Sequence, residues 1–265
     1  MLELLTDLQR AARIAEQAAY AAGTHLQASR ARLTEVMVTQ QAPGDVVAAI
    51  KREVRTLIRD VVARAFPDHG FAGGPPDHAF DPDLPCWVVT PLDGTLNYLR
   101  GYPQYAVSIA LVEDGRPRIG VIYDPCRNEF FGAIAGQGAV LNGVRITCAK
   151  GRPAQESLAA TVFPRPASPR MPVYMSELGR VLRAYGGVRR SGSMALELAC
   201  VAAGRLDAFW QHDLDPLDAS AGIVLLQETG ALLHARDGLP LLRSHSVLAC
   251  TPPLFESFLG LLADG

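Results

Sequence analysis

The segment best suited to chemistry is an apolar run, residues 87–95, that ends in one acid followed by two small residues. If this run is a strand, its end presents the carboxylate of Asp93 to a cation. The backbone amides of Gly94 and Thr95 can then hold a phosphate where a short helix begins. The alternative is structural: Asp93 caps that helix in an Asx-type turn, which on spacing alone is the commoner use of such an acid.

Two segments of the second half carry weaker signals. In residues 213–222, Asp215 followed by a proline is typical of a helix start, and the helix dipole favours Asp218 in the next turn. That explanation is sufficient unless another carboxylate points to the same place. Residues 190–196 form a Gly-Ser turn before a helix, and its amides can face an anion. Most such turns do no chemistry.

The first half of the chain must position the first segment. Apolar residues recur at three- and four-residue steps in 2–28 and 45–66, which predicts two amphipathic helices. A short strand is expected at 33–39, and a loop in the Gly-, Pro- and Asp-rich residues 67–85. A mostly antiparallel sheet with a hairpin turn at 113–116 follows. Its strands are expected at 86–89, 105–112, 118–123, 129–134 and 144–147.

The second half alternates strands and helices, which is typical of an α/β unit. Strands are expected at 157–162, 207–211, 231–233 and 246–250. Helices are expected at 175–185, 193–203, 216–229 and at the end of the chain to 262. The change of pattern predicts an N-terminal half of residues 1–150, a C-terminal half of residues 151–265 and a site between them.

Composition narrows the class of protein. The 265 residues include 25 Lys+Arg against 27 Asp+Glu, and a formal charge of −2 argues against a dedicated nucleic-acid binder. No apolar run reaches the length of a membrane span, and no basic start of a signal peptide is visible. The five cysteines are scattered without a CxxC pair, so we expect neither a disulfide framework nor a zinc site. These features favour a soluble cytoplasmic protein.

Taken in order, the segments resemble the inositol monophosphatase family. The matching segments are residues 43–47, 66–71, 87–95, 105–110, 123–129, 141–143, 190–193, 202–207 and 218–222. The resemblance implies an α+β or α/β fold, a layered α-β-α-β-α sandwich of the inositol monophosphatase and fructose-1,6-bisphosphatase type, usually found as a homodimer. It also implies an Mg²⁺-dependent, lithium-sensitive phosphomonoesterase whose site lies between the two halves.

The resemblance assigns roles to individual residues. Asp93 corresponds to the acid that bridges the metals, the Leu92 carbonyl to a backbone metal ligand and Asp218 to the C-terminal metal ligand. Gly94 and Thr95 correspond to the phosphate-binding amides, and the Thr95 hydroxyl to the group that helps orient the attacking water. Asp93 and Thr95 are therefore the candidate catalytic residues.

The resemblance also places residues on the substrate side. Gly192 and Ser193 correspond to the turn beside the phosphate or substrate. Met194 stands where the family has a small residue in the pocket wall. Gln211 stands where the family has an acid that meets the substrate hydroxyls.

Three metal-binding positions depart from the family. The acid before the proline of the central motif is Thr90, the first glutamate after the Phe-Pro-Asp-His-Gly segment is Gly74, and the acid near the metals on the second helix is Lys51. Threonine is a poor Mg²⁺ ligand, and glycine offers only its backbone. With Asp93 and Asp218 left, we expect one weakly held Mg²⁺ ion at most, or none.

Lys51 suggests a tethered counter-ion. Two acids buried together repel each other unless a cation lies between them, and an ammonium group on a flexible stem can supply that charge in place of a metal. The alternative, in which Lys51 points into solvent from its helix, fits the sequence equally well.

The predicted function is that of a family member with impaired or absent catalysis. It would bind a small phosphorylated ligand or a protein partner, since some bacterial members of the family also work in transcription complexes. The first alternative is an active Mg²⁺-dependent phosphomonoesterase on inositol phosphate or a related sugar phosphate, with a site rebuilt from acids such as Asp77 or Asp83. The second is a metal-free anion binder that uses the amides of residues 94–95 and 192–193. We expect a homodimer, and no direct contact with a membrane or nucleic acid.

Overall fold

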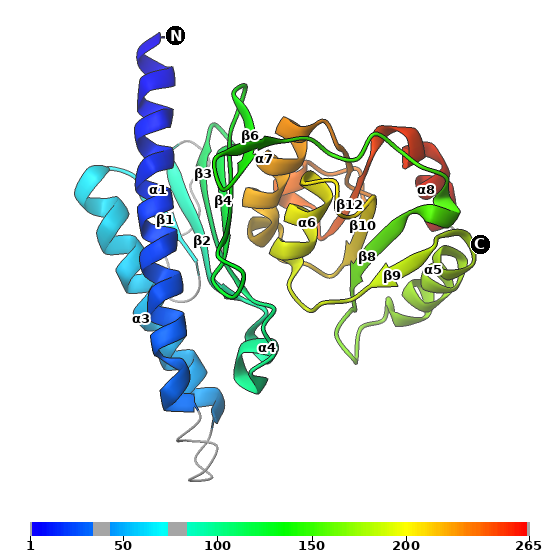
Figure 1. Ribbon diagram of the computed structural model, residues 1–265, viewed down its shortest axis with the longest axis horizontal. Coiled ribbons are helices and arrows are strands. Elements are labelled where there is room, and N and C mark those ends of the chain that lie inside the picture. Colours follow the sequence, from blue (N-terminus) through cyan, green and yellow to red (C-terminus); the bar gives the residue numbers. More distant parts are fainter. Residues whose placement is uncertain (1, 34–42, 74–83, 264–265) are drawn as a thin grey trace.

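The described residues form five layers, in the order helices, sheet, helices, sheet, helices (Figure 1). This computed structural model describes residues 2–33, 43–73 and 84–263. Three apolar clusters fill the space between the layers: one beneath the first helices, one around the middle helices and one beneath the last helices. The predicted α-β-α-β-α layering is confirmed.

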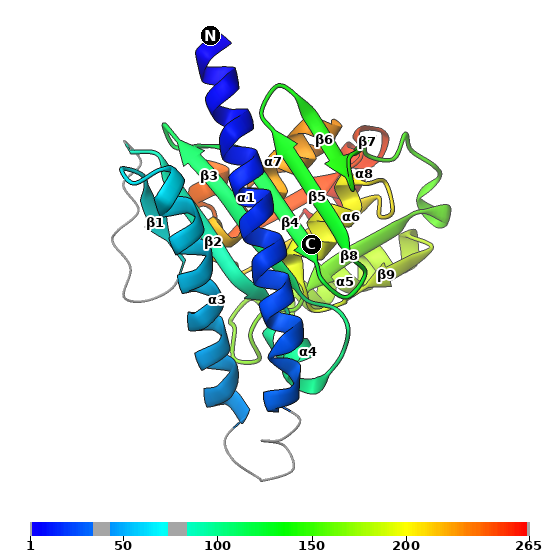
Figure 2. The same ribbon diagram turned by 60° about the vertical axis from the view of Figure 1, so that its left-hand side comes forward.

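The first layer is a pair of helices, α1 (Leu2–Ala28) and α3 (Pro43–Ala65), which lie side by side across one face of the first sheet (Figure 2). Small residues on α1, including Ala15, Ala18 and Ala19, are completely buried and allow close packing. Both helices were predicted from their apolar period. Leu33, the first residue of the strand predicted at 33–39, is helical instead, and residues 34–39 lie outside the described residues.

The first sheet contains seven strands in sequence order. They are β1 (Gly70–Ala72), β2 (Cys86–Asp93), β3 (Ala106–Glu113), β4 (Arg116–Asp124), β5 (Glu129–Ile134), β6 (Gly138–Leu141) and β7 (Val144–Ile146). β1 pairs with β2 in parallel, and the later pairs are antiparallel. Because β1 lies within 67–85, the prediction of a continuous loop there is wrong.

The turn predicted at 113–116 is confirmed as the β3–β4 hairpin. Asp114 and Gly115 have positive φ angles of 51° and 66°, as a two-residue hairpin turn requires. After β2 the chain forms a short helix, α4 (Thr95–Arg100), which places the residues that follow Asp93.

The middle layer consists of α6 (Met194–Ala202) and α7 (Ser220–Thr229). Two glycines allow it to pack closely. A Cβ on Gly120 of β4 would lie 2.3 Å from the Ala221 carbonyl oxygen of α7, and a Cβ on Gly222 would lie 2.8 Å from Leu198 Cβ of α6. The helix predicted at 216–229 is a 3₁₀ turn followed by α7.

The second sheet has five strands in the order β11-β12-β10-β8-β9. They are β8 (Leu158–Val162), β9 (Gly187–Arg189), β10 (Ala208–His212), β11 (Leu232–His234) and β12 (Ser246–Cys250). Helices α5 (Met171–Ala184) and α8 (Phe255–Leu262) cover its outer face and bury Trp210 and Phe258 (Figure 1). The short strands β6 and β9 were not predicted.

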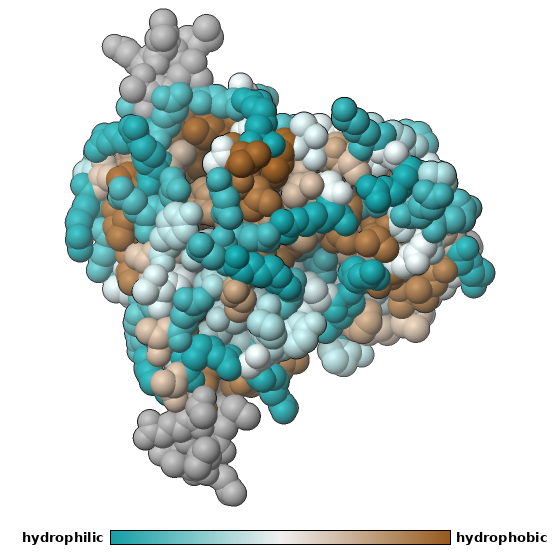
Figure 3. All heavy atoms as spheres, in the orientation of Figure 1, coloured by the Kyte–Doolittle hydropathy of each residue, from teal (hydrophilic) through white to brown (hydrophobic). Residues whose placement is uncertain are grey.

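The surface drawn in Figure 3 adds little about the function of the protein. On the face drawn in Figure 3, hydrophilic and hydrophobic residues are interspersed, as on ordinary protein surfaces. Within the described ranges, no helix is both long enough and apolar enough to cross a membrane. The division into halves at residue 150 stays a prediction.

Candidate functional site

Asp93 is the last residue of β2, and it follows an irregularity in the pairing of that strand. The register of β2 against β3 shifts between Thr90 and Asp93, where Pro91 has no amide hydrogen to donate. Gly94 follows with a φ of +77°. A Cβ there would lie 2.7 Å from the Gln104 carbonyl oxygen, so this turn requires glycine.

The turn before α6 holds the Asp93 carboxylate. Asp93 Oδ2 accepts hydrogen bonds from Ser193 Oγ (2.6 Å) and from the Ala195 backbone amide (2.8 Å). Burial raises the pKa of Asp93, whereas these two bonds, the Gly94 amide and the charge of Lys51 act in the opposite direction. Two of the predicted segments therefore meet, and Ser193 contacts an acid of the protein itself.

Two more predicted residues contact each other beside Asp93. Thr95 Oγ1 donates a hydrogen bond to the Leu92 carbonyl oxygen over 3.2 Å. Asn97, which the sequence did not mark as a site residue, joins this corner to the turn before α6. Its Nδ2 donates to the carbonyl oxygens of Ser191 (2.8 Å) and Gln104 (2.7 Å). The sequence feature that could have indicated Asn97 was its position in the first turn of α4.

Asp218 lies in the 3₁₀ turn before α7 and contacts one of the substituted positions. Thr90 Oγ1 donates a hydrogen bond to Asp218 Oδ1 over 2.6 Å. Asp218 as a residue is exposed, but protein atoms crowd its carboxyl group, and this desolvation raises its pKa. The hydrogen bond from Thr90 opposes the rise, the charges of Asp215 and Asp93 add to it, and Lys51 opposes it.

A cleft of about 460 Å³ opens beside Thr90 and Asp218. Its opposite wall is α3, which contributes Lys51, Arg52 and Arg55. Lys51 is half-buried, and its charge acts on both Asp93 and Asp218. The side chain therefore lies on the side of α3 that faces these acids.

The described residues do not fit the carboxylate set of a site with two or three metal ions. In residues 2–33, 43–73 and 84–263, no three His, Cys, Asp or Glu side chains are grouped to hold a metal ion. Asp93 Oδ2 already accepts two hydrogen bonds, and Asp218 Oδ1 accepts one from the Thr90 hydroxyl. The sequence positions Gly74, Asp77 and Asp83 lie outside the described residues.

The predicted substrate-side residues lie in the second half of the chain. Met194 begins α6 and is buried directly after Ser193, and a Cβ on Gly192 would lie 3.0 Å from Asn97 Nδ2. Gln211 lies in β10, and its carboxamide oxygen is buried without a hydrogen-bond partner. A buried oxygen of this kind is an acceptor that a bound ligand can satisfy.

Glu197 is a buried acid that sequence reasoning missed. It is 3% exposed, and its Oε1 accepts a hydrogen bond from the Ser191 backbone amide (2.8 Å). Burial raises the pKa of Glu197, the bonds from Ser191 oppose this, and the charge of Asp93 adds to it. Glu197 fixes the turn that holds Asp93. The signal was an acid one helical turn after Ser193.

The layered fold is that of the solved inositol monophosphatase structures described below. The chain belongs to the inositol monophosphatase family, whose sequence model it matches over residues 7–262. The predicted family and fold type are therefore confirmed.

Relatives with two different names are similar to this chain. The Nus factor SuhB of Escherichia coli is 34% identical over 253 residues, which are 95% of each chain. The inositol-1-monophosphatase of Synechocystis sp. is 35% identical over 237 residues, 89% of this chain and 82% of that one.

Two solved structures resemble the whole chain. The extragenic suppressor protein suhB of Bartonella henselae matches with a TM-score of 0.84 and 31% identity, over 96% of this chain and 98% of that one. The inositol monophosphatase of Anabaena (Nostoc) sp. matches with a TM-score of 0.83 and 33% identity, over 97% of this chain and 96% of that one.

Proposed function

We propose that this chain binds a small phosphorylated ligand in the cleft between α3, β2 and the turn before α7, and that its phosphatase chemistry is impaired. The observation that carries the proposal is the 2.6 Å hydrogen bond from Thr90 to Asp218. A hydroxyl donor stands where the family resemblance calls for an acid, so one remaining metal-ligand acid is occupied by a protein group. At most one weakly bound Mg²⁺ ion, held through Asp93, Asp218 and the Leu92 carbonyl, belongs to this proposal.

The chain's own residues support binding better than hydrolysis. Lys51, Arg52 and Arg55 supply positive charge along one wall of the cleft. Hydrolysis of a phosphomonoester also needs a water held and activated beside the phosphorus, which a cluster of metal ions normally provides. The described acids are too few for such a cluster.

Kinetics with a restored variant test the proposal. Wild type and a Thr90→Asp, Gly74→Glu, Lys51→Asp variant are assayed on a panel of phosphomonoesters, including inositol 1-phosphate, during a titration with Mg²⁺. We expect the wild type to turn over about a thousandfold more slowly than the variant, since several kcal/mol of transition-state stabilisation are missing. Wild-type turnover equal to that of a family phosphatase assayed alongside contradicts impaired catalysis.

The second candidate function is an active Mg²⁺-dependent phosphomonoesterase with a rebuilt site. It is favoured by the contact between Thr95 and the Leu92 carbonyl beside Asp93, and by the relative named inositol-1-monophosphatase. On this candidate, the wild type shows saturable Mg²⁺-dependent turnover. Loss of that turnover in Asp77→Asn or Asp83→Asn would identify the added acid.

The relatives named Nus factor SuhB motivate a further part of the proposal, a protein partner. We propose a cytoplasmic homodimer that contacts such a partner. Light scattering of the purified protein tests the dimer, and a monomer at micromolar concentration contradicts it. Affinity purification from the native cell, with Arg64→Gln and Lys51→Gln compared with wild type, tests the partner.

A further inference from the structure

The basic wall of the cleft is one face of a single helix. Lys51 and Arg55 are four residues apart on α3, so their side chains leave the helix on the same side, with Arg52 beside them. Like charges at this spacing destabilise an isolated helix. Asp218 lies across the cleft, and the negative charges of Asp218 and Asp93 offset part of this cost through Lys51.

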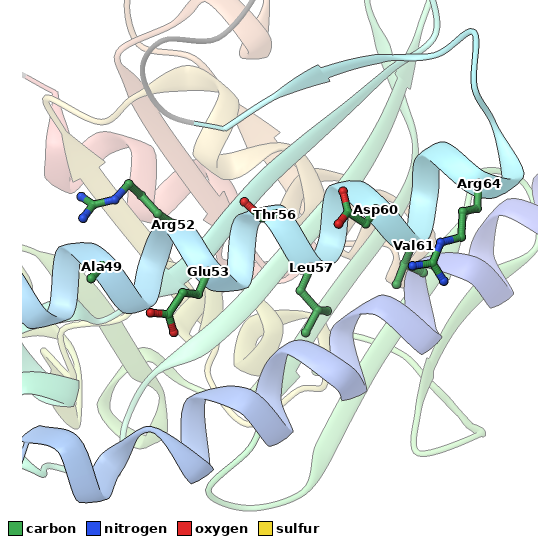
Figure 4. A pocket seen from close by; sticks show the side chains of 8 residues that line it. All are labelled: Ala49, Arg52, Glu53, Thr56, Leu57, Asp60, Val61 and Arg64. Carbon is green, nitrogen blue, oxygen red and sulfur yellow. The ribbon is translucent and has the colours of Figure 1, made fainter.

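The outer side of α3 is built differently. Figure 4 shows a second pocket lined by α3, where Glu53 and Asp60 accompany Arg52 and Arg64. Glu53 is paired with Arg32 Nη1 at 2.7 Å. The second pocket is thus lined by acids as well as bases, whereas every charged residue that α3 contributes to the cleft is a cation, and Arg52 lies at the edge that the two share.

Lys51 is the residue of α3 whose charge acts on both Asp93 and Asp218. An ammonium group is a compact charge on a flexible stem, and that of Lys51 acts on Asp93 and Asp218 together. A dication placed beside these acids would be repelled by Lys51. Farther along α3, burial and then the like charge of Arg59 lower the pKa of Arg55, so an anion that enters the cleft stabilises its charged form.

Resting on the phosphate binding proposed above, we infer that the cleft takes the phosphate group of a phosphomonoester directly on Lys51, Arg52 and Arg55, without a divalent cation. The guanidinium group of Arg52 can offer two parallel N–H donors to phosphate oxygens, Arg55, which lies over the Phe71 ring, adds positive charge, and the ammonium group of Lys51 offers a single point of charge. The positive charge that binds the phosphate then comes from side chains of α3.

Titration calorimetry with inorganic phosphate tests the inference. Wild type is measured once in EDTA and once in MgCl₂, and we expect the same Kd in both. Lys51→Gln should weaken binding about tenfold or more, because a charge-assisted contact is lost. Lys51→Arg should restore most of the affinity. Arg64→Gln, on the outer side of the same helix, is the matched control and should bind like wild type.

The outcomes separate the inference from the proposed function. Phosphate binding that requires Mg²⁺ overturns the inference and leaves the proposed function standing. Binding that survives unchanged in Lys51→Gln and Arg55→Gln also overturns it. If the wild type binds neither inorganic phosphate nor any phosphomonoester of the panel, with or without Mg²⁺, both fall. Where Lys51→Gln does not fold, Arg52→Gln and Arg55→Gln carry the same comparison against Arg64→Gln.

Discussion

Buried acids are stabilised in opposite ways in two regions of this molecule. Beneath the outer helices of the second sheet, Glu177 is completely buried and contacts His212 Nε2 (2.8 Å) and the Arg236 guanidinium group. At the end of β2, Asp93 accepts hydrogen bonds from a hydroxyl and from amides. Burial raises the pKa of both acids. The bonds from His212 and Arg236 outweigh this and hold the pKa of Glu177 below its ordinary value, whereas the pKa of Asp93 stays raised.

The difference separates an acid paired with cations from an acid held by neutral donors. A buried charge is tolerated where hydrogen-bonded cations surround it, and it then fixes the segments that carry them. Arg236 also donates to the Leu262 carbonyl oxygen, so the Glu177 cluster ties α5 and β10 to the end of α8. The charge of Lys51 also acts on Asp93, and Lys51 lines the cleft opposite Asp218.

Replacing Glu177 is expected to have the largest effect. Glu177→Gln leaves Arg236 without its carboxylate partner, and breaking a buried pair of this kind costs about 3–5 kcal/mol of unfolding free energy. Urea denaturation at pH 7 measures the loss. Glu156→Gln, at an exposed glutamate, is the control and should change stability by less than about 0.5 kcal/mol. Equal losses of unfolding free energy in the two variants would contradict a structural role for Glu177.

The pH dependence of that loss sharpens the comparison. Because the folded pKa of Glu177 is lowered, its stabilisation is fully present above its unfolded value of 4.5 and is lost as the pH falls through the folded pKa. The stability gap between wild type and Glu177→Gln should therefore narrow below pH 4.5. Urea titrations at several pH values between 7 and 3 measure the gap. A gap that stays constant over this range contradicts the assignment.

Asp93→Asn should show the opposite dependence at a smaller size. A raised folded pKa gives stabilisation that is present below the unfolded value of 3.8 and is lost as the pH rises through the folded pKa. Asparagine keeps one oxygen for Ser193 or Ala195, so we expect a cost of about 1–2 kcal/mol at low pH and less at pH 8. The same urea titrations measure it. If the loss of stability in Asp93→Asn grows with pH, Asp93 behaves like Glu177, and the proposed difference between the two acids is wrong.

The parts of the fold that could be predicted are those with a local pattern. The apolar period of α1 and α3 is visible within each helix. β1 and β9 have three residues each and are strands because they pair with β2 and β8. No period can be read from three residues, and the glycines of residues 67–85 indicated a loop.

The candidate site also has parts that a local pattern predicts and parts that it does not. Asp93 and Asp218 were found because each lies in a motif that resembles the family's, and the motif is local. Their partners are not local: Ser193 is 100 residues from Asp93, and Thr90 is 128 residues from Asp218. Glu197 acts on a backbone turn, so its role emerges only once that turn has been placed against Asp93.

Thr90 offers the smallest expected effect and the most direct test of what the cleft prefers. Thr90→Val removes the hydroxyl that donates to Asp218, and because Asp218 is exposed, water can replace the bond. We expect a loss of about 1 kcal/mol or less, the same with and without Mg²⁺. Thr90→Asp places a second carboxylate there, which should lower the melting temperature in EDTA, and Mg²⁺ should restore it by binding the folded state.

Thermal melts of wild type and both variants, in EDTA and in MgCl₂, make the measurement. In the wild type, the charge of Lys51 and the hydrogen bond from the Thr90 hydroxyl already stabilise the Asp218 carboxylate. Added Mg²⁺ should therefore leave the melting temperature of the wild type unchanged. If Mg²⁺ stabilises the wild type as much as it stabilises Thr90→Asp, the cleft already contains the donors of a metal site. Asp218 would then be paired with a cation, as Glu177 is. The cation would be Mg²⁺ from solution, whereas for Glu177 it is the side chain of Arg236.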